Sequence, residues 1–304
     1  MSAIERDAGW RPCVPTRHQL AEGARWFAGG LLYVDLLRGA LYRCRGTADA
    51  APEHLLDLGV PLGAVAPVRD AGWKWVLAAG DGIALWPSRG RGPEWLARPE
   101  QRTDLAMRMN DGACDAAGRF WAGSMEVGAA AGAGSLYRTD PDGSVNRVLD
   151  GLTVPNGPAF SADGTLMYLA DSARGTITRH TVDPATGGLG LGLGEPFVRL
   201  APHEGRPDGM TVDDDGKLWV ALWGSGRIRC YDREGCVRRT VAVPTAHASS
   251  VAFGGGLMFV TTARHKLSRP GPLAGAVLAR ASSVSAPAAR GFGRTSLGQG
   301  RSLT

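Results

Sequence analysis

The sequence contains no long apolar run, no clustered cysteines and no apolar leader. No uninterrupted apolar stretch approaches the roughly 20 residues that a membrane-spanning helix needs. The opening segment, MSAIERDAGW, carries charge where a signal peptide would be apolar. The cysteines are odd in number, widely spaced and without a C-x-x-C pair; they are Cys13, Cys44, Cys114, Cys230 and Cys236. We therefore expect a soluble, reduced protein of the cytoplasm with no membrane partner.

Signatures of several function classes are also absent. The formal charge is +5, yet the arginines are scattered and form no basic block, which argues against a nucleic-acid partner. There is no G-x-S-x-G nucleophile elbow, and the six histidines show no H-x-x-x-H ligand spacing. The run GGLGLGLG (187–194) lacks the G-x-G-x-x-G spacing of a dinucleotide site and indicates a loop.

Glycine, in contrast, is plentiful and periodic. The chain has 44 glycines, and in six segments a glycine precedes a large apolar residue by three positions. The pairs are Gly30/Tyr33, Gly72/Trp75, Gly118/Trp121, Gly164/Met167, Gly216/Trp219 and Gly256/Phe259. Subtracting the positions of successive glycines gives intervals of 42, 46, 46, 52 and 40 residues. A propeller blade of four short strands needs roughly 40–50 residues, so the intervals fit blades.

This period predicts an all-β fold, a six-bladed β-propeller in which the glycines form hairpin turns. A chain of 304 residues with 44% hydrophobic content can bury the core of such a ring. We expect an N-terminal extension over 1–15, the propeller over 16–281 and a C-terminal tail over 282–304. The tail is a candidate to supply a ring-closing strand before a flexible end.

The residues eight positions before each glycine of the repeat share one phase. They are Glu22, Ala64, Asn110, Asn156, Asp208 and Ala248. Equivalent positions in a ring of equivalent blades face the same place, so these side chains should converge at one mouth of the channel. Taken singly, Asn-Gly and Asp-Gly are common turn dipeptides. Taken together, two carboxylates and two amides predict an oxygen-ligand site for Ca²⁺, Mg²⁺ or Mn²⁺, with Zn²⁺ as an alternative.

Five segments, in this order and spacing, resemble the SMP-30/gluconolactonase family, which includes regucalcin and bacterial sugar-acid lactonases. They are LAEGARW (20–26), RMNDGACDAAGRFWAGSM (108–125), VPNGPAFSADGTLMYLADS (154–172), RPDGMTVDDDGKLWVALW (206–223) and SVAFGGGLMFVTTA (250–263). The resemblance runs from about Leu20 to about Leu278. It implies a six-bladed propeller with one divalent metal in the channel, for which we expect Ca²⁺ first.

The resemblance also assigns roles to residues of this chain. The family's metal ligands fall on Glu22, Asn156 and Asp208, and Asp208 is also the expected catalytic base. The family's substrate contacts fall on Arg108 and Asn110, with Glu126 as the candidate for a further acidic contact. The chain departs from the family pattern at Ala21 and Ala24, which replace a usual Gly and Pro, and in the loop through Gly128.

Together with these residues, the resemblance implies a metal-dependent hydrolase that opens a small lactone, most simply a sugar lactone, and we expect a monomer or weak homo-oligomer. Asp171 is a candidate to support the site or to fix a turn, and Trp223 to form core or pocket wall. Three alternatives remain at this point. They are a hydrolase of another ester or a phosphotriester, a regucalcin-like calcium-binding protein without catalysis, and an interaction scaffold. The sequence lacks the Gly-His and Trp-Asp signatures of WD40 propellers, which argues against the scaffold.

Overall fold

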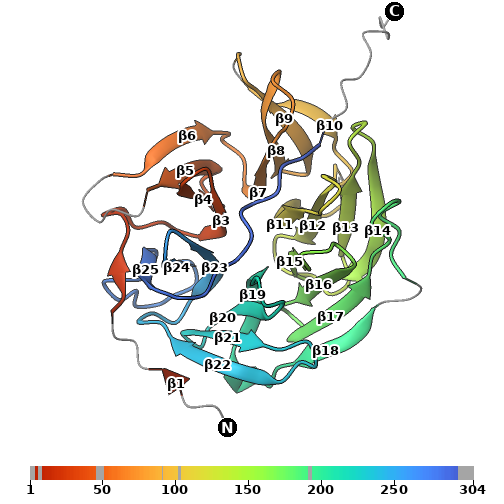
Figure 1. Cartoon of the computed structure of the whole chain (residues 1–304). Helices are drawn as coiled ribbons and strands as arrows, with labels where there is room; N and C mark the ends of the chain where they lie inside the picture. Colours follow the sequence, from red (N-terminus) through yellow and green to blue (C-terminus); the bar gives the residue numbers. More distant parts are fainter. Residues whose placement is uncertain are drawn as a thin grey trace, which may run out of the picture.

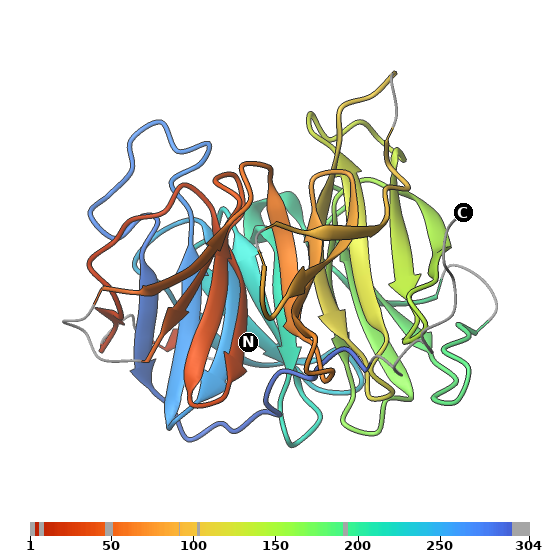
Figure 2. The same cartoon turned by 90° about the horizontal axis from the view of Figure 1, so that it is seen from above.

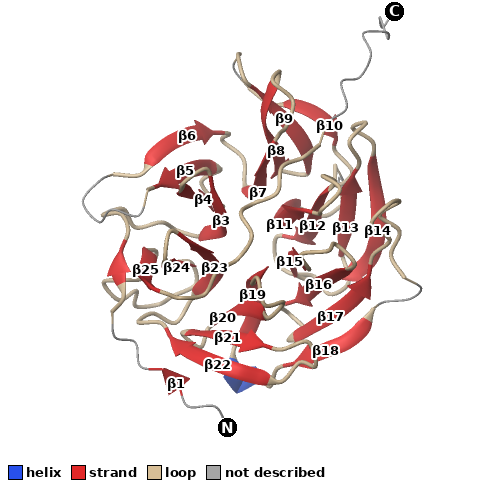
Figure 3. Ribbon diagram, in the orientation of Figure 1, coloured by secondary structure: helices blue, strands red, loops and turns tan. Residues whose placement is uncertain are grey.

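The computed structural model describes residues 4–5, 9–45, 51–90, 92–101, 104–190 and 194–293. Its strands form six sheets, and five of the six contain four strands that are consecutive in the sequence. The sheets stand as blades around a central axis (Figure 1). The predicted six-bladed β-propeller is therefore confirmed. The described part contains one helical segment, the 3₁₀ turn η1 (Pro202–Glu204) (Figure 3). No helix among these residues has the length and apolar character to cross a membrane.

The blades follow one another along the chain. Blade one has β3 (Ala21–Phe27), β4 (Gly30–Asp35), β5 (Ala40–Cys44) and β6 (Glu53–Asp57). Blade two has β7 (Leu62–Pro67), β8 (Trp73–Ala79), β9 (Gly82–Pro87) and β10 (Glu94–Ala97). Blade three has β11 (Met107–Cys114), β12 (Phe120–Glu126), β13 (Gly134–Thr139) and β14 (Val145–Leu152).

The second half of the ring repeats this order. Blade four has β15 (Pro155–Phe160), β16 (Leu166–Asp171), β17 (Thr176–Thr181) and β18 (Glu195–Arg199). Blade five has β19 (Arg206–Val212), β20 (Leu218–Trp223), β21 (Arg227–Tyr231) and β22 (Val237–Ala242), with β1 (Ile4–Glu5) parallel to β22. Blade six has β23 (Ala248–Gly254), β24 (Leu257–Thr262), β25 (Val277–Ala281) and β2 (Arg11–Pro12).

The apolar residues of the glycine repeat all lie in the second strand of their blades. Each has at most 5% of its surface exposed, because the second strand is covered by neighbouring blades on both faces. In blades three and five an aspartate fixes the turn that precedes this strand. Asp115 accepts the indole N–H of Trp121 at 3.0 Å, and Asp213 accepts that of Trp219 at 2.8 Å. The repeat in the sequence is therefore a repeat of hairpin turns with their buried anchors.

The N-terminal end of the chain completes the ring, whereas the sequence suggested the C-terminal tail for this role. Strand β2 pairs antiparallel with β25, although its residues fall in the segment expected to be an N-terminal extension. The ring is thus closed by an N-terminal strand. The C-terminal residues 282–293 form no strand of a blade and instead cross the face that carries the first turn of each blade (Figure 2). The predicted flexible end falls outside the described residues.

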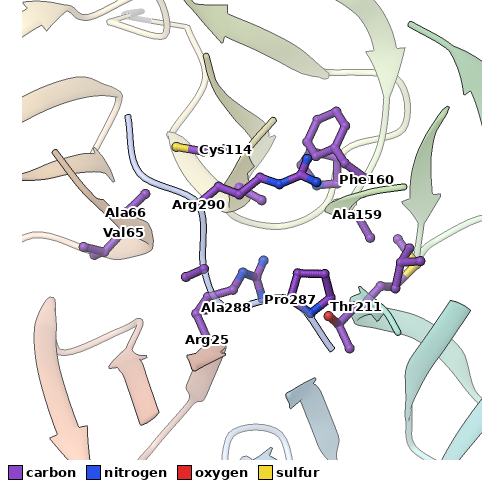
Figure 4. A pocket seen from close by; sticks show the side chains of 15 residues that line it. Arg25, Val65, Ala66, Cys114, Ala159, Phe160, Thr211, Pro287, Ala288 and Arg290 are labelled. Atoms are coloured by element: carbon purple, nitrogen blue, oxygen red, sulfur yellow. The ribbon is translucent and has the colours of Figure 1, made fainter. Parts of the chain in front are cut away.

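The C-terminal segment closes one mouth of the channel. Ser285 accepts the N–H of Asp214 in blade five, Ala289 donates to Trp26 in blade one, and Phe292 donates to Pro67 in blade two. A cavity of about 80 Å³ remains between this segment and the inner strands, lined by Arg25 and Arg290 among others (Figure 4). The other mouth is therefore the one through which a ligand can reach the channel.

Candidate active site

The innermost strand of each blade breaks its pairing register at an equivalent place. In β3 the shift lies between Glu22 and Arg25, and in β15 between Asn156 and Ala159. The corresponding shifts in β11 and β19 enclose Asn110 and Asp208. A bulge re-aims the side chains beside it and bends the strand. These bulges explain why residues of one sequence phase turn toward the channel axis together.

The predicted residues meet in one cavity at the open mouth. Its volume is about 310 Å³, and five of the six predicted site residues line it: Glu22, Arg108, Asn110, Asn156 and Asp208. They come from four different blades, one, three, four and five. Convergence of polar side chains from separated parts of the chain into one hollow is typical of a ligand site.

A chain of hydrogen bonds links the floor of this cavity. Arg108 Nη1 donates to Asn110 Oδ1 at 2.7 Å, and Asn110 Nδ2 donates to Asn156 Oδ1 at 3.1 Å. Asn156 Nδ2 in turn donates to Ser172 Oγ at 2.7 Å, and Ser172 donates to the carbonyl of Pro207. The chain fixes the orientation of both amides, with the oxygen of Asn156 turned toward Asn110, in the cavity that the two carboxylates also line.

The carboxylates of the floor are buried close to one another. Glu22 is 8% exposed and Asp208 is 5% exposed. Burial raises the pKa of Glu22 to about 8, against the opposing effect of the Arg108 guanidinium. Burial, and then the charge of Glu22, raises the pKa of Asp208 well above its usual range. A bound cation would stabilise the ionised forms of both carboxylates, which burial and their mutual repulsion disfavour.

An ion pair lies beneath this floor. Arg25 contacts Asp111 at 3.4 Å, and Asp111 accepts the backbone N–H of Gly112 at 2.8 Å and of Gly157 at 3.0 Å. The pair therefore ties the strand of Glu22 to the strands of Asn110 and Asn156.

The residues present fit a hard divalent cation. Glu22 Oε2 is buried and has no hydrogen-bond partner, which is costly unless another group binds it. No group of three or more His, Cys, Asp or Glu side chains in the described part of the chain could hold a metal. A site here therefore depends on the amide oxygen of Asn156 beside the two carboxylates. This mixed oxygen set suits Ca²⁺, Mg²⁺ or Mn²⁺ better than a soft metal.

Two other predicted candidates lie elsewhere. Glu126 does not line the cavity; one of its carboxylate oxygens accepts the N–H of Ala130 at 2.9 Å, within its own loop. That loop turns sharply, with Ala129 at φ 64°, so its acid caps the turn. Asp171 accepts the N–H groups of Thr153 and Val154 at 2.9 and 3.1 Å, which fixes the loop that leads into β15.

Several cavity residues could not be picked out by the repeat. Ser172, Arg206, His265 and Lys266 all line it, as does Trp223, which the sequence suggested as core or pocket wall. The Trp223 ring stacks on His247 with 4.0 Å between centroids. Ser172, His265 and Lys266 follow the second strands of blades four and six, where the loops differ in length and share no phase, and Trp223 ends the second strand of blade five. The aromatic side chain at the end of β20 was the one signal available.

The chain matches the model of the SMP-30/Gluconolactonase/LRE-like region over residues 20–264. The chain belongs to this family. Within the SMP-30/gluconolactonase family it is 36% identical to an L-arabinolactonase of Azospirillum brasilense, over 83% of this chain and 84% of the relative. It is 33% identical to regucalcin of Gallus gallus, over 83% of this chain and 86% of the relative.

A solved structure of the family gives the same picture of the fold. The calcium-binding protein regucalcin from Agrobacterium tumefaciens superimposes with a TM-score of 0.86 at 26% identity, covering 96% of this chain and 99% of the other. The family region ends at residue 264, so it includes the five converging residues and stops just before His265 and Lys266.

Proposed function

We propose that the chain is a metal-dependent hydrolase that opens a small sugar lactone to its sugar acid. The observation that carries the proposal is the buried, unpartnered Glu22 Oε2 beside Asn156 and Asp208, with Arg108 and Asn110 adjoining. Simple metal storage gives no reason for the last two residues. Family relatives named L-arabinolactonase and pentonolactonase support the same reaction class.

The chemistry follows from these residues. Glu22, Asn156 and Asp208 would hold one divalent ion, for which we propose Ca²⁺ first, and the ion would polarise the lactone carbonyl. Asp208 would accept a proton from water as the water oxygen bonds to the carbonyl carbon. The ring C–O bond then breaks, and the leaving oxygen takes up the proton. Arg108 and Asn110 would orient the ring through its hydroxyl groups.

The test is lactone hydrolysis by metal-stripped protein reconstituted separately with Ca²⁺, Mg²⁺, Mn²⁺ and Zn²⁺. The panel holds glucono-, galactono-, xylono- and arabinono-lactones, with Asp208→Ala as the variant. We expect metal-dependent turnover, with a loss of at least about 10³-fold in Asp208→Ala because the variant removes a ligand and the base together. Metal binding without turnover of any lactone would move the assignment to another ester or to a calcium-binding role.

The remaining proposals concern the cellular compartment, the oligomeric state and the partners of the protein. Cys114 and Cys230 are buried free thiols and Cys236 is an exposed one, which supports a reducing compartment such as the cytoplasm. We propose a monomer or weak homo-oligomer that acts on a small molecule and has neither a nucleic acid nor a membrane as partner. Size-exclusion chromatography with light scattering measures the oligomeric state directly.

A further inference from the structure

The mouth of the cavity has two chemically different sides. Blades one to four contribute apolar residues to it, namely Leu20, Leu37, Pro61, Met125, Val127 and Val154. Blades five and six contribute basic and aromatic residues, namely Arg206, Trp223, His265 and Lys266. A ligand that fills the cavity therefore meets an apolar wall on one flank and hydrogen-bond donors on the other.

The apolar wall is open to solvent before a ligand binds. Leu37 is 39% exposed and Val127 is 55% exposed, and both are among the few large apolar side chains of the described residues that reach the surface. Large exposed apolar side chains that gather at the rim of a concave site usually mark a contact surface for a ligand. Here they line the same cavity as the polar residues of the floor.

The same wall offers little to a hydroxyl group. Glu126, the acid expected to bind one, is engaged within its own loop, and its neighbours Val127 and Ala129 line the cavity instead. A ligand hydroxyl placed against the wall would lose its bonds to water without replacement, and such a loss costs binding.

A sugar lactone whose terminal carbon is a methyl group matches this two-sided shape. The hydroxyls near the carbonyl can face the donors of the floor and the basic side, and the methyl can cover the apolar wall. We propose that the site prefers lactones of deoxy sugars, with a methyl at the terminal carbon, over their fully hydroxylated counterparts. This proposal rests on the proposed function and specifies the substrate class.

The experiment compares lactones that differ by one hydroxyl. The pairs are L-fucono- with L-galactono-lactone, D-fucono- with D-galactono-lactone, and L-rhamnono- with L-mannono-lactone. We expect kcat/KM to favour the deoxy member at least about tenfold in any pair that is turned over, in the range that one apolar contact and one unpaired hydroxyl can supply. Equal rates, or faster hydrolysis of the hydroxylated member, would overturn the preference.

Two isosteric variants locate the cause of the preference. Val127→Thr places a hydroxyl in the wall and should reduce the deoxy preference at least about threefold, because the new group can bond the terminal hydroxyl. The control Val237→Thr changes an exposed valine of β22, the fourth strand of blade five, outside the cavity, and should leave the ratio as it is. An unchanged ratio in Val127→Thr would remove the wall as the determinant.

The outcomes separate this proposal from the one on which it rests. Hydrolysis of hydroxylated lactones alone, with no deoxy lactone turned over, refutes the preference and leaves the lactonase function standing. Hydrolysis of no lactone in either set, by protein that binds the metal, refutes both. Turnover of deoxy lactones that the hydroxylated members do not match supports both.

Discussion

At the scale of single residues, the side chain of Asn156 is held at both ends. Its nitrogen donates to Ser172 at 2.7 Å, and its oxygen accepts from Asn110 at 3.1 Å. An amide serves as a metal ligand only when its oxygen, and not its nitrogen, faces the ion. Ser172 sets the orientation of the amide here, because it donates its own hydroxyl hydrogen to the carbonyl of Pro207. Its oxygen is therefore left to accept from the amide.

Replacing Ser172 should weaken metal binding without touching a ligand. In Ser172→Ala we expect the affinity for Ca²⁺ to fall about tenfold, since loss of a group that orients a ligand typically costs 10–100-fold. Titration calorimetry of metal-stripped protein measures the change. Ser144→Ala, at an exposed turn where the hydroxyl bonds Asp142, is the matched control and should bind as the natural chain does. Equal affinities for the two variants would mean that Asn156 is oriented by Asn110 alone.

At the scale of strands, the inner strands of neighbouring blades approach one another very closely. Gly63 in β7 lies against the backbone of Asn110 in β11, and a Cβ at position 63 would overlap the Asn110 carbonyl. Backbone cannot yield as a flexible side chain can, so an added methyl must push β11 outward. The glycine thus sets the distance between two strands and, through it, the position of Asn110.

Gly63→Ala should disturb both stability and the site. We expect a loss of about 1–3 kcal/mol in the free energy of unfolding, the usual cost of overpacking, and at least about a tenfold loss of kcat/KM. Denaturant unfolding and lactone assays measure the two effects. Gly271→Ala, where an added Cβ meets nothing within 4 Å, should change neither. A stable and fully active Gly63→Ala protein would show that the strands can separate without cost.

The strands also explain what the sequence could and could not predict. Turn glycines and buried aromatics recur at blade length, so the number of blades and the second strands could be predicted. Glu22 and Asp208 could be found because inner strands bulge at equivalent places. Ser172 and Lys266 follow second strands in loops with no common length, so the repeat gave no signal for them. Glu126 was a candidate because it directly follows the family phrase that ends at Met125, but the structure shows its carboxylate engaged in the turn of its own loop.

At the scale of the whole molecule, the two ends of the chain have different structural roles. Strand β2 pairs with β25, so blade six combines one strand from near the start of the sequence with three strands from near its end. The segment 282–293 then spans the closed mouth and contacts blades one, two, three and five. Neither end could be assigned from the repeat, because each carries only a fragment of a blade or none.

Phe292 is the anchor of that spanning segment. Its side chain is fully buried, and its backbone pairs with Pro67 and Arg69 of blade two. In Phe292→Ala we expect a loss of about 3 kcal/mol in the free energy of unfolding, as for other buried phenylalanines. Trp95→Ala, at an aromatic 37% exposed on the outer strand of blade two, should cost less than about 1 kcal/mol.

The same variant separates closure of the channel from chemistry. Because Phe292 lies on the face opposite the open cavity, kcat/KM at 25 °C should stay within about twofold while the protein remains folded. Thermal unfolding and the lactone assay, done on the same preparations, give both quantities. A large loss of activity at unchanged stability would mean that the C-terminal segment acts on the site through the channel. The expected pattern, lower stability with intact turnover, would make the closed mouth a structural seal and leave the reaction to the open one.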